Sequence, residues 1–458
     1  MPTYDVAVIG AGPGGYIAAI RAAQLGLKVV VIEREEVGGV CLNWGCIPSK
    51  ALLRNAEVVE LFHDAEKFGI TYDNMQVDLG KAIDRSRQVV DRLVRGVKQL
   101  FKKHKIDVVM GTARFETPNR LVVEPGAQVI EAAAVIIATG ARSKDLPMLK
   151  ADGRTVLTSR EALALRELPK SIAIIGGGAV GVEFAYFFRC YGSEVTIIEL
   201  LPRLVPSEDE EVSRQLERSL GRQGIVIKTG VGVESVEHTK DGIRLTLGGE
   251  GGVVEAEKVL LGVGVLPNTE GLGLEKVGVA LERGFIKIDD QMRTNIPGVY
   301  AIGDVTGKML LAHVASAQGV IAAETIKGLP LDPIHYPDMP RGTYCQPQVA
   351  SMGLTEAQAK AAGRNIKVGK FPFAASGKAI AMGNLDGFVK IVADVETAEI
   401  LGAHLIGHDV TDLLAEISVA KMLEGTAREL GRAVHTHPTL SESVMEAGLG
   451  AVGESLNF

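Results

Sequence analysis

A pattern of four glycines and one glutamate occurs twice in this sequence, and it restricts the possible folds more than any other feature. The first copy consists of Gly10, Gly12, Gly15, Gly26 and Glu33, and the second of Gly176, Gly178, Gly181, Gly192 and Glu199, each shifted by 166 residues. The alternative is two unrelated glycine-rich turns without a ligand. Five coincident positions argue against that alternative.

The residues around each copy supply the rest of a strand–turn–helix–strand unit. Residues 4–9 and 28–32 read as buried strands, and residues 16–25 have helical spacing. Residues 171–175 and 194–198 are the matching strands of the second copy. In such units the glycines let the backbone approach a pyrophosphate at a helix N-terminus, while the glutamate accepts hydrogen bonds from ribose hydroxyls. The sequence therefore predicts two nucleotide-binding domains.

Three further strand-like runs end in a glycine turn, at residues 135–140, 259–264 and 299–304. The first two complete the two units. The third follows the second unit, so the simplest explanation is that the chain leaves the first domain near residue 145 and returns near residue 270. We predict a first domain of residues 1–145 and 270–335, with a second domain of residues 146–269 inserted in it.

The pattern changes from about Tyr336. Residues 388–392 and 400–405 alternate like antiparallel strands, and residues 412–430 read as one long amphipathic helix. We predict a third domain of the α+β class at residues 336–458. The predicted fold class is α/β, with two Rossmann-like domains and this C-terminal α+β domain.

Composition excludes several classes of protein. The chain has 458 residues and a formal net charge of −7, and no basic stripe stands out, so we expect no nucleic acid partner. No apolar run reaches the roughly 18–20 residues that cross a bilayer, and no signal peptide is recognisable. Four cysteines do not form a disulfide scaffold. We therefore expect a reducing, cytoplasmic setting without membrane attachment.

Two of the four cysteines, Cys41 and Cys46, lie just beyond the first glycine pattern. On a continuous helix, positions five apart do not suit a relaxed disulfide, so a bridge there must distort the helix, and Gly45 and Pro48 suit such a distortion. Strained disulfides turn over more readily, and a cysteine near a helix N-terminus has a favoured thiolate. This favours a redox-active pair.

Three other interpretations compete with a redox pair. A zinc site needs two more ligands, and Cys190 and Cys345 lie alone in unrelated contexts, where we interpret them as ordinary core or loop residues. The cytoplasmic setting disfavours a structural bridge. Two inert thiols stay possible, but they would not explain why the pair adjoins a nucleotide unit. We predict no metal site.

The segment Gly-Gly-Val-Cys-Leu-Asn-Trp-Gly-Cys-Ile-Pro-Ser-Lys at residues 38–50 resembles the active-site signature of the dihydrolipoamide dehydrogenases, within the pyridine nucleotide–disulfide oxidoreductase family. The resemblance covers nearly the whole chain. It includes both glycine patterns, residues 293–304, and the run His-Thr-His-Pro-Thr-Leu-Ser-Glu at residues 435–442.

The resemblance implies which nucleotide each domain holds. FAD would lie on the first pattern, with the residues Gly10, Gly12, Gly15, Glu33, Lys50, Gly140, Gly303 and Asp304. NAD would lie on the second, with Gly176, Gly178, Gly181, Glu199 and Gly264. A carboxylate at Glu199 suits the free ribose hydroxyl of NAD and repels the phosphate of NADP. The only nearby cation, Arg203, carries little weight.

The resemblance also implies catalytic roles. Cys41 would exchange with lipoamide sulfur and Cys46 would stack against the flavin. Lys50, paired with Glu183, would stabilise the reduced flavin. His437 would be the base that deprotonates dihydrolipoamide, oriented by Glu442, whereas His435 would be structural. Electrons would pass from dihydrolipoamide through Cys41–Cys46 and FAD to NAD⁺.

The implied assembly is a homodimer with shared active sites, because in this family the loop that carries the base belongs to the partner subunit. The C-terminal domain would form the dimer interface. Implied partners are dihydrolipoamide, free or on a lipoyl domain, and the acyltransferase core of a 2-oxoacid dehydrogenase complex. The alternative from a different functional class is a binding subunit, whose main role is to dock onto that core and not to turn over substrate.

Three other types of flavin enzyme are rivals to this interpretation, and the sequence also departs from the family pattern at one position. Glu199 argues against a glutathione-type reductase, the absence of cysteine in residues 453–458 argues against a mercuric reductase, and Cys46 disfavours a transhydrogenase. Val265 stands where the family usually has arginine. This should remove a polar contact near the domain junction and affect nucleotide binding in detail.

Overall fold

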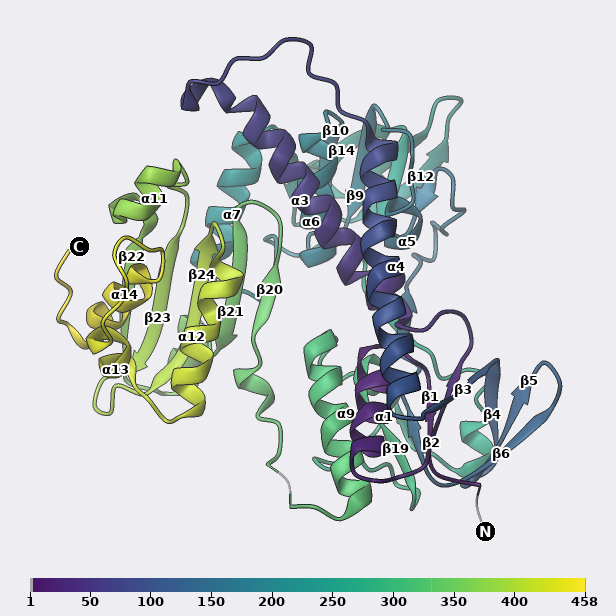
Figure 1. The fold of residues 1–458 in the computed structure, drawn as a ribbon. Helices are drawn as coiled ribbons and strands as arrows, with labels where there is room; N and C mark the ends of the chain where they lie inside the picture. Colours follow the sequence, from purple (N-terminus) through teal and green to yellow (C-terminus); the bar gives the residue numbers. More distant parts are fainter. Residues whose placement is uncertain (1–2, 331, 458) are drawn as a thin grey trace. The chain divides into compact units, whose positions relative to one another are not determined.

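The computed structural model describes residues 3–330 and 332–457 (Figure 1). Met1 and Phe458, the outer limits of the predicted domains, lie outside this range. The chain divides into two compact units. Unit 1 contains Met1–Leu52, Gly80–Lys144 and Gly264–Tyr336, and unit 2 contains Leu53–Leu79, Asp145–Val263 and Pro337–Phe458. The predicted division into three domains stays a prediction.

A parallel sheet in the order β3-β2-β1-β6-β19 forms the centre of unit 1. Its strands are β1 (Tyr4–Ile9), β2 (Val29–Glu33), β3 (Asp107–Met110), β6 (Gln128–Ile137) and β19 (Val299–Ala301). The antiparallel strands β4 (Thr112–Thr117) and β5 (Arg120–Glu124) extend from β6. Because β19 pairs with β6, the chain returns to its first sheet after more than 150 residues elsewhere.

Three helices cover one face of this sheet: α1 (Pro13–Gln24), α4 (Leu79–Lys103) and α9 (Ala312–Lys327). Small side chains such as Ala18, Ala19 and Ala322 let α1 and α9 lie side by side (Figure 1). The turn between β1 and α1 therefore sits at the carboxyl end of the parallel strands, where open α/β sheets bind their ligands.

The first part of unit 2 repeats this plan. Its parallel sheet has the order β11-β10-β9-β15-β8, built from β8 (Val156–Leu157), β9 (Ser171–Ile175), β10 (Glu194–Glu199), β11 (Val226–Thr229) and β15 (Lys258–Leu261). The helices α6 (Ala179–Cys190) and α7 (Glu210–Arg222) follow β9 and β10. An antiparallel sheet of β12 (Val233–His238), β13 (Ile243–Leu247) and β14 (Gly252–Ala256) packs against it.

The C-terminal part of unit 2 is an antiparallel sheet in the order β20-β21-β24-β23-β22. Its strands are β20 (Arg341–Thr343), β21 (Gln348–Gly353), β22 (Ile366–Pro372), β23 (Phe388–Asp394) and β24 (Ile400–Gly407). The helices α12 (Val410–Met422) and α14 (Glu442–Val452) pack on it (Figure 1). The predicted fold class is confirmed.

One predicted helix is wrong in length. Residues 412–430 do not form a single helix, because α12 ends at Met422 and α13 (Ala427–Arg432) begins after a break. At the break Glu424 has a φ of +57°, and the Ala427 N–H bonds to the Ala398 carbonyl instead of continuing the helix. Periodicity alone did not reveal this turn, because the apolar spacing continues through it.

Helix α4 carries exposed basic residues that did not stand out in the sequence. Exposed basic residues three to four positions apart share one face of α4: Arg92, Arg95, Lys98 and Lys102. The low net charge hid this face, because acidic residues elsewhere offset it. Separately, no helix within the described residues combines the length and apolarity needed to span a membrane.

Candidate active site

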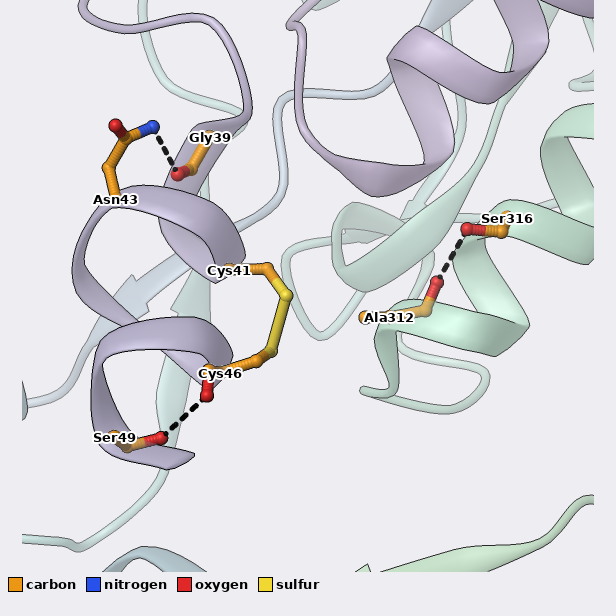
Figure 2. The surroundings of a disulfide bond; sticks show 7 residues. All are labelled: Gly39, Cys41, Asn43, Cys46, Ser49, Ala312 and Ser316. Carbon is orange, nitrogen blue, oxygen red and sulfur yellow. Dashed lines mark hydrogen bonds between the residues drawn. A yellow bond between two sulfur atoms is a disulfide. The ribbon is translucent and has the colours of Figure 1, made fainter. Parts of the chain in front are cut away.

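The two cysteines lie on two helices that meet at a break. Helix α2 (Gly39–Trp44) ends before Gly45, and α3 (Cys46–His63) begins directly after it. Cys41 and Cys46 form a disulfide, with their Cα atoms 4.7 Å apart (Figure 2). A Cβ atom on residue 45 would lie 2.9 Å from the Val40 carbonyl oxygen, so the break requires glycine. The predicted distortion of the helix is present at Gly45.

The break gives each cysteine a place in the first turn of a helix. Cys46 is the first residue of α3, which has 18 residues, whereas Cys41 is the third residue of α2, which has 6. The partial positive charge at a helix N-terminus stabilises a thiolate, and the longer helix supplies more of it. This geometry favours Cys46 as the resting thiolate after reduction.

Side chains within the segment hold it in place (Figure 2). The Asn43 amide donates to the carbonyl oxygens of Val37 at 3.1 Å and Gly39 at 3.0 Å, and the Ser49 hydroxyl donates to the Cys46 carbonyl at 3.0 Å. Sequence reasoning did not single out Asn43 or Ser49. Their types, which bond readily to nearby backbone, were the available signal.

A cavity of about 580 Å³ in unit 1 is lined in part by the disulfide. Its lining includes Cys41 and Cys46 together with six of the predicted FAD residues: Gly10, Gly12, Glu33, Gly140, Gly303 and Asp304. Gly15 and Lys50 are not part of the lining. Gly111, Thr112 and Ala113 are, and sequence reasoning missed them, although they follow β3 at the carboxyl edge of the sheet where a ligand is expected.

The glycine turn has the shape needed to hold a pyrophosphate. A Cβ on Gly15 would lie 1.9 Å from the Gly10 carbonyl oxygen, so Gly15 allows the helix to pack against the turn. A Cβ on Gly12 would meet only the Gly39 Cα, at 4.0 Å. Gly12 thus leaves open space at the uncapped N-terminus of α1, where free N–H groups attract an anion. The residues present fit a dinucleotide such as FAD.

Glu33 has a second role that the sequence did not reveal. Its buried carboxylate accepts hydrogen bonds from the Ala11 N–H and the Glu35 N–H, both at 2.7 Å. The carboxylate therefore fixes the glycine turn and still has lone pairs for a ribose hydroxyl.

The second glycine pattern repeats this geometry in unit 2. Glu199 accepts from the Gly177 N–H at 2.6 Å and the Leu201 N–H at 2.7 Å. A Cβ on Gly181 would lie 1.8 Å from the Gly176 carbonyl oxygen, whereas one on Gly178 would have nothing within 4 Å. These residues fit a second dinucleotide.

Arg203, the cation near Glu199 in the sequence, is not directed at the nucleotide. The Arg203 guanidinium donates to the Pro206 carbonyl at 3.1 Å, which turns it into its own loop. Glu199 is then the charged group at the end of β10, which supports NAD over NADP.

The open space at Gly178 gives a sharp prediction. Gly178→Ala should fold, because residue 178 has a φ of −75°, but its methyl group should displace the nucleotide and raise the KM for NAD⁺ about tenfold or more. Steady-state kinetics with NAD⁺ varied will measure this. The matched control is Gly221→Ala, which also adds a methyl to open space, on α7. Equal KM values in both variants would contradict the assignment.

Asp304 lies in the wall of the cavity at the start of a helical turn. Its carboxylate has no hydrogen-bond partner among residues 3–330 and 332–457, and burial raises the pKa of Asp304 to about 6. A ligand hydroxyl that donates to it would favour the charged form. This environment fits the predicted contact with the ribityl chain of FAD.

The raised pKa predicts a pH effect on the protein without FAD. The folded state binds a proton that the unfolded state releases between about pH 4 and pH 6, so the contribution of Asp304 to stability falls as pH rises through this window. Asp304→Asn should remove that fall, and should stabilise apoprotein at pH 7.5 by at most about 3 kcal/mol while weakening FAD binding. Urea unfolding of both apoproteins at pH 4.5 and 7.5 will test it. A pH-independent difference would contradict the prediction.

An arginine lies on the strand that pairs with the strand of Val265. Strand β16 (Val265–Pro267) pairs with β7 (Ala141–Ser143), and both belong to unit 1. The Arg142 guanidinium donates to the Pro267 carbonyl at 3.1 Å, to the Asn268 amide oxygen at 3.2 Å and to Glu270 at 2.9 Å. The strand pair therefore keeps a guanidinium contact, supplied by the opposite strand.

His437 and Glu442 meet as predicted in unit 2. The imidazole Nδ1 lies 2.9 Å from the Glu442 carboxylate, whose other oxygen accepts from the Thr439 N–H at 2.8 Å. The Thr439 N–H and the His437 imidazole hold the pKa of Glu442 below its ordinary value. The His437 side chain is 80% exposed, so Nε2 is available to a substrate from outside this chain.

Unlike His437, His435 has a buried side chain. Its ring nitrogens lie 2.6 Å from the Glu416 carboxylate and 2.9 Å from the Ala433 carbonyl, and its side chain is 7% exposed. This arrangement favours the structural role predicted for His435.

The remaining predicted residues are spread over the chain. Lys50 lies one turn along α3 from Cys46 in unit 1, and Glu183 lies on α6 in unit 2, where it accepts from the Tyr344 N–H at 3.0 Å. The Lys50–Glu183 pair stays a prediction. Gly264 has a φ of +99° at the edge of unit 1, and nothing lies within 4 Å of a Cβ built there.

Comparison with known proteins places this sequence in a family. The sequence pattern of the family described as pyridine nucleotide-disulphide oxidoreductase matches residues 4–319, and its dimerisation domain matches residues 339–448. The chain belongs to the pyridine nucleotide–disulphide oxidoreductase family. Members of this family use FAD and a pyridine nucleotide, so this chain is a flavin- and NAD-dependent enzyme with a dimerisation domain.

Relatives within the family are similar over their full lengths. The dihydrolipoyl dehydrogenase of Mycobacterium leprae is 50% identical, with 100% of both chains covered, and that of Bacillus subtilis is 46% identical, with 99% of both covered. Among solved structures, LpdA of Mycobacterium tuberculosis has a TM-score of 0.91 at 29% identity, covering 97% of this chain and 99% of its own. The HOCl-induced flavoprotein disulfide reductase RclA of Escherichia coli has a TM-score of 0.87 at 29% identity, with the same coverage.

Proposed function

We propose that this chain is a dihydrolipoamide dehydrogenase, which oxidises dihydrolipoamide to lipoamide and reduces NAD⁺ to NADH with release of one proton. The observation that carries the proposal is the Cys41–Cys46 disulfide in the wall of the same cavity as Glu33 and Asp304. Full-length relatives with this name at 46–50% identity support the substrate.

The two cysteines perform the exchange with substrate. A substrate thiolate attacks the Cys41 sulfur, the Cys41–Cys46 bond breaks, and Cys46 leaves as a thiolate stabilised by the N-terminus of α3. The second substrate thiolate then attacks the substrate sulfur of the mixed disulfide, so that lipoamide leaves and Cys41 becomes a thiolate that takes a proton. When bound, FAD supplies the two-electron chemistry that connects this dithiol with the nicotinamide.

His437 is the base that takes a proton from the substrate thiol. A free dithiol is a poor nucleophile until it is deprotonated, and an imidazole accepts the proton near neutral pH. Glu442 accepts from Nδ1–H, which fixes the tautomer with a free lone pair on Nε2 and favours the protonated ring afterwards.

The site is shared between two subunits in this proposal. Exposed apolar side chains gather on α12 and near the histidine loop: Val419, Met422, Leu423 and Val434, the last of them 99% exposed. A second copy of the chain would cover them, as expected for a dimerisation domain. The exposed His437 would then face the disulfide of the partner.

We further propose association with the acyltransferase core of a 2-oxoacid dehydrogenase complex in a reducing cytoplasm. Support comes from the substrate and from the low cysteine content. Co-migration of the chain with such a core on gel filtration would support it, whereas elution as a free dimer in the presence of the core would contradict it.

A substrate panel tests the reaction. Lipoamide, glutathione disulfide and mercuric ion are each assayed with NADH and with NADPH. We expect lipoamide with NADH to exceed every other combination by at least about a hundredfold in kcat/KM. Faster turnover of glutathione disulfide or mercuric ion would replace the proposal with a different reductase.

A further inference from the structure

The break at Gly45 leaves backbone groups that need partners. Because α2 ends at Trp44, the carbonyls of its last turn have no N–H four residues on within the same helix. Asn43 belongs to this turn, and it lies between the two cysteines. Its carbonyl must find a partner elsewhere, or the break costs free energy.

Arg87 on α4 is that partner. Its Nη1 donates to the Asn43 carbonyl oxygen at 2.6 Å, a charge-assisted bond across 44 residues of sequence. The Asn43 side chain meanwhile ties the other end of α2 through Val37 and Gly39. Asn43 therefore anchors α2 at both ends, and Arg87 supplies the anchor at the end that faces Cys46.

The other two nitrogen atoms of the Arg87 guanidinium are buried. Nε and Nη2 are buried without a hydrogen-bond partner in the described part of the chain, and no ion pair with Arg87 is found there. Burial lowers the pKa of Arg87, while Asp91, one turn along α4, opposes this shift. An arginine stays charged in this setting, so a positive charge that Asp91 offsets only in part lies beside the redox segment.

We propose that Arg87 is a positioning residue of the redox disulfide: by capping the Asn43 carbonyl it holds the break between α2 and α3 that sets Cys41 opposite Cys46. Its charge also favours the thiolate formed on reduction. The inference rests on the proposed function only for its lipoamide readout, because the disulfide and the flavin belong to the family at large.

The test uses holoenzyme with Arg87→Met, Arg87→Lys and a control. Arg85→Met is the matched control, because Arg85 lies on the same helix and donates to a backbone carbonyl at 3.2 Å, but to that of Ala51 within α3 and not to a residue between the cysteines. In Arg87→Met we expect the lipoamide kcat to fall at least about tenfold, since a small misplacement of reacting groups has large effects. NADH turnover with ferricyanide, which bypasses the cysteines, should stay within twofold.

A spectroscopic readout separates positioning from general damage. Anaerobic NADH produces the long-wavelength absorbance of a thiolate against flavin, and the pH at which half of it is lost on acidification should rise by about one unit in Arg87→Met. Arg87→Lys keeps the charge, so it should show a smaller rise. In reduced apoprotein, the midpoint for alkylation of Cys46 by iodoacetamide should rise in the same way.

The outcomes are distinct. Wild-type values of lipoamide kcat and absorbance midpoint in Arg87→Met overturn the proposal, and so does an equal loss in Arg85→Met. If Arg87→Met does not retain FAD, Arg87→Lys decides: a lower lipoamide kcat with unchanged ferricyanide turnover supports the proposal, and an unchanged kcat overturns it. Lack of lipoamide turnover in the wild type would overturn the proposed function instead, while the absorbance still tests Arg87.

Discussion

Cys46→Ser is expected to abolish lipoamide turnover, with a loss of at least about 10³-fold, and to abolish the long-wavelength absorbance on anaerobic reduction with NADH. Cys46 lines the cavity together with Cys41, but only Cys46 begins the long helix α3, whose N-terminus favours a thiolate, so the absorbing thiolate should be that of Cys46. Stopped-flow absorbance and a lipoamide assay measure both effects.

The companion variants make this result specific. In Cys41→Ser the disulfide cannot form, so Cys46 should absorb at long wavelength without any reductant, again without lipoamide turnover. Cys190→Ser is the matched control, because Cys190 is a free cysteine outside the cavity whose pKa is raised by burial to about 12. If Cys46→Ser keeps both the absorbance and the turnover, the roles assigned to the pair are wrong.

His437→Gln is expected to lower the lipoamide kcat by about 10²–10⁴-fold near neutral pH, because the substrate thiol loses its base. The effect of Glu442→Gln should be smaller, since the imidazole remains but loses the carboxylate that orients it. NADH turnover with ferricyanide should be unchanged in both variants. His435→Gln is the control, since both ring nitrogens of His435 already have partners within unit 2.

Subunit mixing tests whether the histidine acts on the partner's disulfide. In a dimer of one Cys46→Ser chain and one His437→Gln chain, one of the two sites has an intact disulfide and an intact histidine. After complete exchange of equal amounts, about a quarter of the wild-type activity should return, because half of the dimers are mixed. If no activity returns although mixed dimers form, each site lies within one chain.

Several features of the fold could be predicted because they depend on short-range geometry. Glycine is required at residues 15 and 181 because a Cβ atom there would lie 1.9 and 1.8 Å from the carbonyl oxygen five residues earlier in the chain, so the same spacing recurs wherever this turn forms. The strands predicted at residues 4–9 and 171–175 match β1 and β9 for the same reason. The helix predicted at residues 412–430 failed, because a left-handed residue at Glu424 leaves apolar periodicity intact.

The candidate site was harder to predict where partners lie far apart. Gly111 lines the cavity, yet nothing near it in the sequence resembles a nucleotide motif. The carboxylate of Glu33 was expected to face only ribose, but it also holds the Ala11 N–H across 22 residues. Val265 suggested a lost contact, and the structure places Arg142 on the opposite strand of the pair.

The sequence by itself determined the chemistry: a repeated glycine turn, a pair of cysteines beside the first turn, and a histidine five residues before a glutamate. Each of these depends on spacing within one segment, where backbone sterics and helix geometry leave few alternatives. Only the tertiary structure decided that Glu33, Cys46 and Asp304 line one cavity, and that Arg87 caps Asn43. Those contacts depend on how side chains from distant segments pack together, and no local pattern records which distant partner a buried group will find.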